Sequence, residues 1–522
     1  MSRNNLKLVF GIFLAVMFVN VANAQSTGWT TQNPSNCSDE YGAFDAFVPG
    51  MRGHGSCNRG GFVPGTTVIR VTNTNSSGSG SLAAAAAAAC PKVILFDVSG
   101  TVEFSGNHIT TRRCDHWSIV GASAPGQFTL ISGDSIPSFT GLGNHWTVDN
   151  MTITTQDGGG SSDSRDVVAF GTNVEEENII VMNNNFIWGG DEDVQCYPNA
   201  AVSVSKILYW QNIIGLGWKT EGDGTNHRFA HIMNGNCLQN ASIRNLYIHA
   251  EGRAPFARPD GYYHANNMTF NSGIQNYVAQ PCGGAAEFTE TFRQNIVNNF
   301  QLKGPDSTGH VSMQFQGATC KSSTKSVYES GNALQIASTQ AISNCTNHSC
   351  TSKPSEISWA DSPITYAQPD GHVPETFDPS SDAELTSFAN NLLEYVGARP
   401  ADRLPYIEGK ITEVRNGLAG SGDMGGQVTS ISSEGGFAVV TAASRTRDST
   451  TQCGGMPTGA AADAIQSSGL TGLHEWVIGC FYDDVMPPGY REGGLANYPD
   501  PEPGDPVVPD DPEVTPNPPT FF

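Results

Sequence analysis

The stretch Ile243–Met268, which reads IRNLYIHAEGRAPFARPDGYYHANNM, decides the fold. It holds two apolar-x-apolar triplets, and an asparagine directly precedes each of them: Asn245 precedes Leu-Tyr-Ile, and Asn267 precedes Met-Thr-Phe. A loop with two arginines separates the triplets. Because apolar residues that alternate with period two are typical of β-strands, this stretch is interpreted as one full turn of a coil built from strands.

The same unit recurs along the chain. Further copies begin at Asn150, Asn185, Asn212 and Asn299, and consecutive copies are between 22 and 35 residues apart. An internal repeat of this length is typical of a solenoid, and no long stripe of apolar residues at helical spacing lies between the copies. The sequence therefore predicts a parallel β-helix. We expect each asparagine to occupy a bend, because asparagine tolerates left-handed dihedral angles and bonds to its own backbone.

The N-terminus has the features of a secretory signal peptide. Residues 1–24 contain Arg3 and Lys7, then the apolar run Leu8–Val21, then Ala22-Asn-Ala24 as a small-residue cleavage site. The run is too short to span a bilayer. We therefore expect a secreted protein, extracellular or periplasmic, with no membrane partner.

The charge balance restricts the partners. The chain has a formal net charge of -23, and without residues 1–24 it has 25 basic and 50 acidic residues, a net charge of -25. This argues against nucleic acid and favours a protein that binds cations. The 12 cysteines all follow the signal peptide, so an oxidising compartment would permit disulfides. Cys345 and Cys350 are a candidate short-loop pair.

The first coils and their cap are expected between Asp45 and Gly133. Val93–Phe96 is typical of a buried strand, whereas Ala83–Ala89 predicts a helix. We expect this helix to cover the open end of the stack of coils.

Several phrases resemble, in the same order, those of the secreted pectate lyases of the first polysaccharide lyase family, over about residues 45 to 420. These phrases are Phe47–Gly50, Asn58–Asn73, Gly78–Ala83, Val93–Val102, Ile119–Gly126, Ile187–Glu192 and the closing segment Tyr395–Gly417. The resemblance implies a right-handed parallel β-helix that cleaves polygalacturonate by calcium-dependent β-elimination.

Carboxylates gather on two successive coils. Asp166 lies on one, and Asp191, Glu192 and Asp193 lie on the next, in WGGDEDVQ. Alternation on an extended segment would direct Asp191, Asp193 and Gln195 to one face and Glu192 to the other. Oxygen ligands in such a cluster suit Ca²⁺, and the resemblance implies the family's calcium carboxylates here. A solvated acidic patch is the alternative.

Three cations follow on the next coils. By resemblance Arg253 matches the catalytic arginine, Arg258 a substrate-binding arginine, and Lys219 the lysine that holds a substrate carboxylate. Arg228 competes with Lys219 for that position. The resemblance makes Arg253 the base that removes the proton alpha to the uronate carboxylate; since arginine is almost always protonated in proteins, we expect an alkaline pH optimum.

The chain departs from the family in three places. Asparagines at 183–185 replace an aspartate and a histidine, RAPF stands where the family has RNPR, and Thr451–Ala461 keeps GMP without the acidic residues of a calcium loop. The first change predicts a site of altered polarity or an altered subsite.

The predicted organisation is a β-helix domain at residues 25–420, an extension packed on or beyond it at 421–497, and a disordered, acidic, proline-rich tail at 498–522. The predicted function is a secreted, monomeric pectate lyase. A lyase or hydrolase for another uronate polymer, or a non-catalytic polysaccharide-binding β-helix, remain alternatives.

Overall fold

The computed structural model describes most of the chain from Cys37 to Tyr482. The described residues are 37–104, 109–110, 114–132, 139–140, 143–155, 166–171, 175–198, 202–217, 228–273, 277–279, 291–307, 314–315, 324–334, 343–344, 358–360, 382–428, 434 and 455–482. The predicted signal peptide, the C-terminal tail, Lys219 and the pair Cys345 and Cys350 lie outside them.

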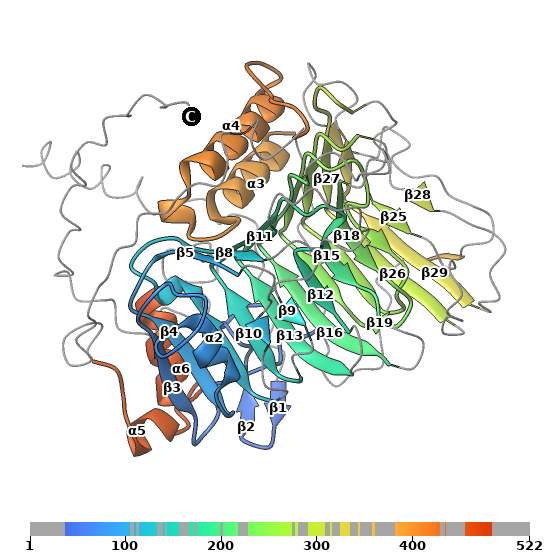
Figure 1. Ribbon diagram of the computed structural model, residues 1–522. Helices are drawn as coiled ribbons and strands as arrows, with labels where there is room; N and C mark the ends of the chain where they lie inside the picture. Colours follow the sequence, from blue (N-terminus) through green and yellow to red (C-terminus); the bar gives the residue numbers. More distant parts are fainter. Residues whose placement is uncertain are drawn as a thin grey trace, which may run out of the picture.

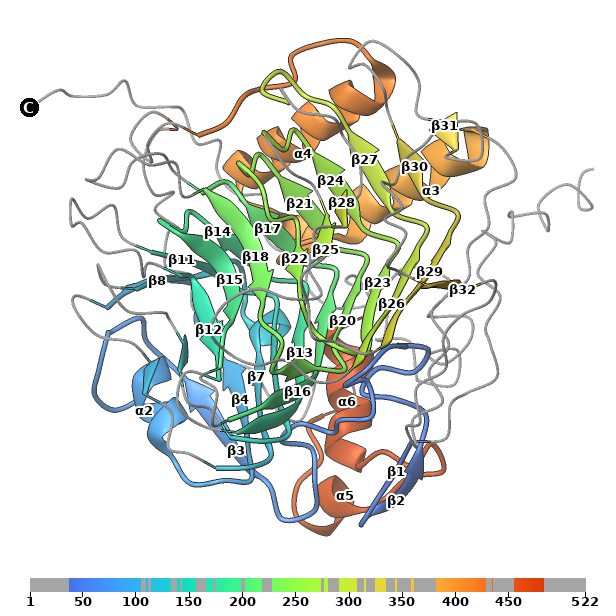
Figure 2. The same ribbon diagram turned by 90° about the vertical axis from the view of Figure 1, so that its right-hand side faces the viewer.

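The chain winds through three long sheets (Figures 1 and 2). The first sheet contains, in spatial order, β3 (Thr67–Val71), β4 (Lys92–Phe96), β7 (Trp117–Val120), β10 (Trp146–Asp149), β13 (Glu176–Met182), β16 (Val204–Trp210), β20 (Ala241–Ile243), β23 (Tyr262–Ala265), β26 (Thr291–Val297), β29 (Thr324–Ser330) and β32 (Ser358–Ala360), with β19 (Cys237–Leu238) beside β16. The second contains β5 (Gly100–Glu103), β8 (Phe128–Ser132), β11 (Thr152–Thr155), β14 (Asn185–Ile187), β17 (Ile213–Gly215), β21 (Leu246–Ile248), β24 (Met268–Phe270), β27 (Phe300–Leu302), β30 (Ala333–Leu334) and β31 (Ser343–Asn344). The third contains β12 (Val168–Phe170), β15 (Glu192–Cys196), β18 (Phe229–Met233), β22 (Phe256–Ala257), β25 (Val278–Ala279) and β28 (Gln314–Phe315).

Each complete coil contributes one strand to each sheet in the same order, for example β13, β14 and β15. Strands of successive coils pair in parallel, so that Trp146 of β10 lies opposite Ile179 of β13 and Asn185 of β14 lies opposite Ile213 of β17. In the three sheets only the β30–β31 pair is antiparallel among the described strands. The predicted right-handed parallel β-helix is confirmed.

Two short pairs lie outside the sheets. β1 (Cys37–Asp39) and β2 (Gly42–Phe44) form an antiparallel hairpin, and β6 (Ile109–Thr110) pairs in parallel with β9 (Phe139–Thr140).

Buried asparagines form a hydrogen-bonded ladder at the corner between the first and second sheets. Its members are Asn184, Asn212, Asn245, Asn267, Asn299 and Asn332. The backbone N–H of Asn212 donates to Oδ1 of Asn245 at 2.9 Å, and Nδ2 of Asn212 donates to the same oxygen at 3.0 Å. Nδ2 also donates to the carbonyl of Val181 on the preceding coil at 2.9 Å. One side chain therefore links three successive coils.

The ladder corrects the predicted role of these asparagines. The left-handed residue is the one before each ladder position, such as Asn183 (φ 50°), Gln211 (φ 52°) and Arg244 (φ 58°). We predicted that these asparagines bond to their own backbone. Instead, the ladder asparagines bond to neighbouring coils. The register is also one residue off in two of the six predicted copies: Asn150 (φ 51°) is a left-handed residue, and the ladder member is Asn184, not Asn185.

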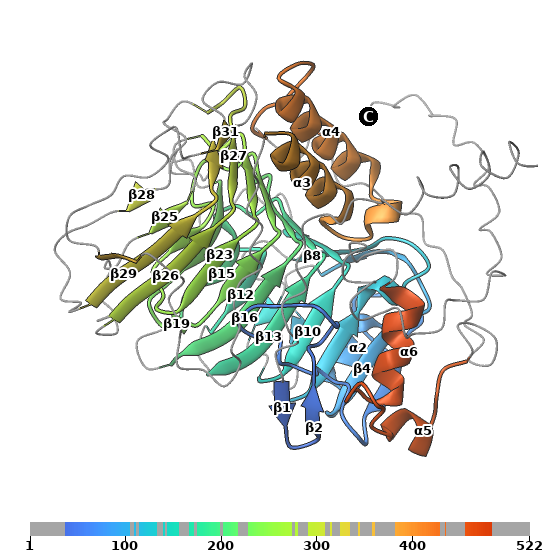
Figure 3. The ribbon, with the colours of Figure 1, turned by 180° about the vertical axis from the view of Figure 1, so that it is seen from behind.

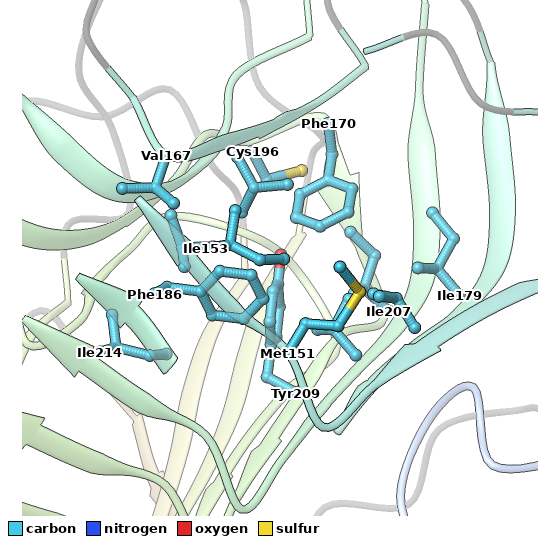
Figure 4. Packing of buried hydrophobic residues seen from close by; sticks show 14 of the residues in the cluster. Met151, Ile153, Val167, Phe170, Ile179, Phe186, Cys196, Ile207, Tyr209 and Ile214 are labelled. Atoms are coloured by element: carbon cyan, nitrogen blue, oxygen red, sulfur yellow. The ribbon is translucent and has the colours of Figure 1, made fainter. Parts of the chain in front are cut away.

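Side chains from all three sheets fill the interior of the coil (Figure 4). Ile179 and Ile207 come from the first sheet, Ile153 and Phe186 from the second, and Phe170 from the third. All of them are almost completely buried. Side chains along a strand alternate between the two faces of the sheet. The neighbours of these interior residues on each strand therefore point to the outer face.

A helix packs beside the first strands, as predicted. α2 (Leu82–Ala87) begins after Ser81, whose hydroxyl accepts the N–H of Ala84 at 3.2 Å. Leu82, Ala85 and Ala86 are buried in the interior cluster. This confirms the helical cap predicted from the alanine run.

C-terminal helices cover the outer faces of two sheets (Figure 3). α3 (Asp382–Tyr395) and α4 (Pro405–Ala419) pack Leu392 and Ile411 against outward residues of the second sheet. A one-turn 3₁₀ helix (Pro400–Asp402) lies between them, and another (Gly121–Ser123) follows β7. α6 (Gly472–Phe481) follows the short α5 (Ala460–Asp463) and packs against the outer face of the first sheet together with the N-terminal segment. No described helix is long and apolar enough to cross a membrane.

Disulfides join segments that are 20 to 41 residues apart in the sequence. The bonded pairs are Cys37–Cys57, Cys90–Cys114 and Cys196–Cys237, and Cys480 is bonded as well. None of the described cysteines is free.

The ladder yields a stability prediction. Asn245→Ala removes an amide that is completely buried and with it the side-chain hydrogen bonds to Asn212, Tyr209 and Asn267 on the adjacent coils. We expect a loss of about 2 to 4 kcal/mol in the free energy of unfolding, measured by guanidinium denaturation. Asn75→Ala, at an exposed loop residue, is the matched control and should change the unfolding midpoint little. Equal midpoints for both variants would contradict a structural role for the ladder.

Candidate functional site

An acidic cluster lies where the chain enters the third sheet. Asp166 comes two residues before β12, Asp191 directly precedes β15, and Glu192 is the first residue of β15. Val168 lies opposite Val194 in the paired strands, so Asp166 and Glu192 lie at the same level on neighbouring coils. The backbone N–H of Glu192 donates to Oδ1 of Asp166 at 3.3 Å. The register of the coils therefore brings carboxylates 26 residues apart into contact range.

These three carboxylates could hold a metal ion. One oxygen from each of Asp166, Asp191 and Glu192 lies within 4.8 Å of the others. The residues are between 2% and 8% exposed, which is unusual for acidic residues without a compensating charge. A buried set made only of carboxylate oxygens fits a hard cation, and of these Ca²⁺ accepts the most flexible geometry.

The predicted facing of these carboxylates is wrong in one respect. Glu192 was expected opposite Asp191, but their side chains are hydrogen-bonded to each other. The reason is that β15 begins at Glu192, so Asp191 lies in the preceding bend, where strand alternation does not apply.

Asp193 is not part of this three-residue group. It is fully buried, and its Oδ1 accepts the N–H of Gly189 at 2.8 Å. Its assignment as a metal ligand stays a prediction.

Burial and mutual repulsion make the cluster hard to ionise. Burial, together with the charges of Glu192 and Asp191, raises the pKa of Asp166 well above its usual range. Burial and the neighbouring Asp191 raise the pKa of Glu192 to about 8, although Arg253 acts in the opposite direction. A cation bound here would remove this cost, because it favours the charged form of every ligand.

Arg253 brings a positive charge to the cluster. Its Nη1 donates to Oε1 of Glu192 in a close ion pair. Its guanidinium carbon lies 3.8 Å from the centre of the Phe229 ring, within the range of a cation–π contact. The side chain is 30% exposed, whereas that of Glu192 is 2% exposed, so the guanidinium is the solvent-facing member of the pair.

Arg258 lies on the same coil, directly after β22. Its guanidinium carbon lies 4.6 Å from the centre of the Phe256 ring. Burial lowers its pKa, and a hydrogen bond with Tyr197 partly opposes this. The structure thus brings the two predicted arginines to one sheet, with an aromatic ring beneath each.

Arg228 is engaged elsewhere. Its Nη2 donates to Oε2 of Glu251 at 2.7 Å, and its Nη1 to the carbonyl of Val428 at 3.3 Å. This buried pair ties the start of β18 to the segment after α4. Lys219, its competitor for the role of substrate-binding cation, is outside the described residues, so that assignment stays a prediction.

The asparagines at 183–185 do not line the acidic cluster. Nδ2 of Asn183 donates to the carbonyl of Tyr395 at 2.7 Å, and Nδ2 of Asn185 donates to Oγ1 of Thr152 at 2.8 Å. Asn184 belongs to the ladder. The expectation of altered site polarity is therefore not met at these contacts: the amides join coils and hold the C-terminal segment.

Sequence reasoning missed the aromatic rings under the arginines. Phe256 stands in the phrase RAPF, and Phe229 directly follows Arg228. The signal that could have found them is an aromatic residue near each arginine: Phe256 on the same coil as Arg258, and Phe229 on the coil next to Arg253.

Comparison with known proteins gives only distant likenesses. No protein-family model and no curated protein matches the chain. It is similar to the solved structure of a pectate lyase from a Bacillus species in complex with trigalacturonate (13% identity, TM-score 0.38, covering 67% of this chain and 98% of that chain). It is also similar to Jun a 1, the major allergen from cedar pollen (12%, 0.37, 65% and 92%). A third is pectate lyase C from Erwinia chrysanthemi at pH 9.5 with 30 mM Ca²⁺ (14%, 0.34, 68% and 97%).

Metal affinity should depend on pH. With the pKa of Glu192 raised to about 8 in the metal-free protein, an ion must displace a proton at neutral pH. We expect Ca²⁺ affinity to increase between about pH 6 and about pH 9, with proton release at pH 7 detected by calorimetry in two buffers of different ionisation enthalpy. An affinity that is constant over this range would contradict the site.

The same shift affects stability without metal. The folded protein retains a proton on Glu192 that the unfolded chain loses above its ordinary pKa near 4.5. The free energy of unfolding of the metal-free protein should therefore fall as the pH rises from about 4.5 through about 8. In Glu192→Gln this fall should be smaller, as measured by denaturation with chelator present. An identical pH dependence in both proteins would refute the assignment.

Proposed function

We propose that this protein is a calcium-dependent polysaccharide lyase that cleaves pectate by β-elimination. The observation that carries the proposal is the contact of Arg253 with the buried carboxylate cluster Asp166, Asp191 and Glu192 on one sheet of a parallel β-helix. A site with anionic metal ligands and adjacent arginines suits a polymer that bears a carboxylate on each sugar. The sequence resemblance to pectate lyases supports the same substrate.

The residues have distinct roles in this proposal. Asp166, Asp191 and Glu192 would hold Ca²⁺, which when bound would stabilise the negative charge that develops on the sugar carboxylate. Arg258 would bind a carboxylate of the polymer. Lys219 would bind a further carboxylate, on the evidence of the resemblance alone.

Arg253 is the candidate base. It would take the proton alpha to the carboxylate; the carbon–oxygen bond beta to that carboxylate then breaks, a carbon–carbon double bond forms, and the leaving oxygen takes a proton from water. An arginine loses its proton only with difficulty. We therefore expect activity to increase at alkaline pH.

The overall negative charge does not exclude an anionic substrate. Repulsion from exposed carboxylates is screened beyond about 8 Å at physiological ionic strength. The two arginines and the bound ion would act at contact distance. We propose further that the protein is exported through its predicted signal peptide, in keeping with its disulfides, and acts as a monomer.

A hydrolase is the second candidate. One carboxyl group with a pKa near 8 next to other carboxylates also resembles the acid of a glycoside hydrolase, which works with a second carboxylate. A hydrolase would need neither Ca²⁺ nor the arginines. Both reactions cut the polymer, but only elimination creates a double bond.

The test is the near-ultraviolet absorbance of polygalacturonate incubated with the purified protein at alkaline pH, with Ca²⁺ or with chelator. We expect an increase that requires Ca²⁺. Arg253→Ala should lower the rate at least about 10²-fold, the scale of a lost general base. The control Arg70→Ala breaks a remote ion pair with Asp97 and should leave the rate unchanged.

Two results would overturn the proposal. New reducing ends without absorbance would indicate hydrolysis. Binding of the polymer without any cleavage would indicate a carbohydrate-binding protein that has no lyase activity.

A further inference from the structure

One exposed aromatic side chain lies on the same sheet as the carboxylate cluster. Tyr197 is 42% exposed, and among the described residues only Ile465 is another large apolar side chain with such exposure. Tyr197 directly follows β15, whose first residue is Glu192. At about 3.3 Å per residue, the five steps along the strand place Tyr197 about 16 Å from the cluster.

The register of the third sheet aligns Tyr197 with Arg258. Cys196 lies opposite Met233, and Met233 lies opposite Ala257. The residues that follow these three, Tyr197, Asn234 and Arg258, are therefore level with one another on three adjacent coils. The N–H of Asn234 donates to the carbonyl of Cys196 at 2.8 Å, and the N–H of Arg258 donates to that of Met233 at 3.1 Å.

The side chains of this row meet. Tyr197 and Arg258 are hydrogen-bonded, although two strand spacings separate their backbones. Ile232, Phe256 and Val278, on the adjacent strands β18, β22 and β25, form a small buried apolar cluster of their own. Arg258 rests on the Phe256 ring at 4.6 Å.

The backbone beneath Tyr197 is firmly held. The preceding residue, Cys196, is bonded to Cys237, and its side chain is completely buried. An exposed aromatic ring on an immobilised backbone binds with little loss of conformational entropy. Here that ring stands beside a guanidinium that is itself supported by Phe256.

We propose that Tyr197 and Arg258 form a second sugar-binding subsite, which takes one uronate unit of the polymer beyond the sugar that the carboxylate cluster holds, with the backbone of Tyr197 about 16 Å along the strand from Glu192. The ring of Tyr197 would stack on the apolar face of the sugar, and the guanidinium of Arg258 would bind its carboxylate. The subsite deepens the proposed function and rests on it.

The distance of Tyr197 from the cluster predicts a dependence on substrate length. Hexagalacturonate cleaved at the cluster extends far enough to reach Tyr197. Trigalacturonate cleaved at the cluster extends at most two sugars to either side and does not reach it. The enzyme should therefore use Tyr197 for longer chains only.

The experiment measures KM and kcat for both oligomers with wild-type protein, Tyr197→Ala and Tyr197→Phe. We expect Tyr197→Ala to increase KM for hexagalacturonate about tenfold, the scale of a lost stacking contact, with KM for trigalacturonate and both kcat values unchanged. Tyr197→Phe keeps the ring and loses the hydroxyl, so its KM for hexagalacturonate should lie between those of wild-type protein and Tyr197→Ala. Ile465→Ala, at a residue equally exposed, is the control and should match wild type.

The outcomes separate this inference from the proposed function. If wild-type protein cleaves neither oligomer nor polymer, the proposed function fails and this subsite fails with it. If wild-type protein is active but Tyr197→Ala has an unchanged KM for hexagalacturonate, only the subsite is refuted. An equal loss with both oligomers would also refute it, because that pattern indicates damage to the cluster.

Discussion

The asparagine ladder is the constraint on which the rest of the structure depends. Each ladder amide is completely or almost completely buried, and its hydrogen bonds join the coil before it and the coil after it, as Asn212 does with Val181 and Asn245. An amide buried without these partners would cost several kcal/mol. The ladder therefore fixes the corner at which the coils from β13 to β30 turn from the first sheet into the second, and the strands of the second sheet on these coils start from it.

A regular corner has consequences for the third sheet. Once the second-sheet strands are in register, the segments that leave them arrive at the third sheet side by side. Asp166, Glu192 and Arg253 all lie at this entry, on different coils, although the loops between their strands differ in length. The scaffold thus holds three acidic side chains and an arginine together, although burial removes the acidic side chains from water and makes their charged forms less stable. Such a conflict with stability is typical of a functional site.

Much of the fold could be predicted from the sequence. The recurring asparagine and apolar triplet predicted a parallel β-helix, and the alanine run predicted its helical cap, because periodicity and composition are local properties. The register at individual corners could not be predicted. In the run of three asparagines at 183–185, the pattern selects Asn185, which directly precedes Phe-Ile-Trp, whereas the hydrogen bond between Asn184 and Asn212 makes Asn184 the ladder member.

The candidate site shows the same division. The sequence alone identified the candidate residues: the acidic phrase around Glu192 and the two arginines five residues apart, in a chain of acidic balance. Only the tertiary structure decided which carboxylates converge, that Arg253 contacts Glu192, and that Tyr197 reaches Arg258. The physical reason is that local geometry sets the alternation of side chains along a strand. Contacts between coils depend instead on the residue at which each strand begins. Hydrogen bonds between residues distant in sequence determine that residue.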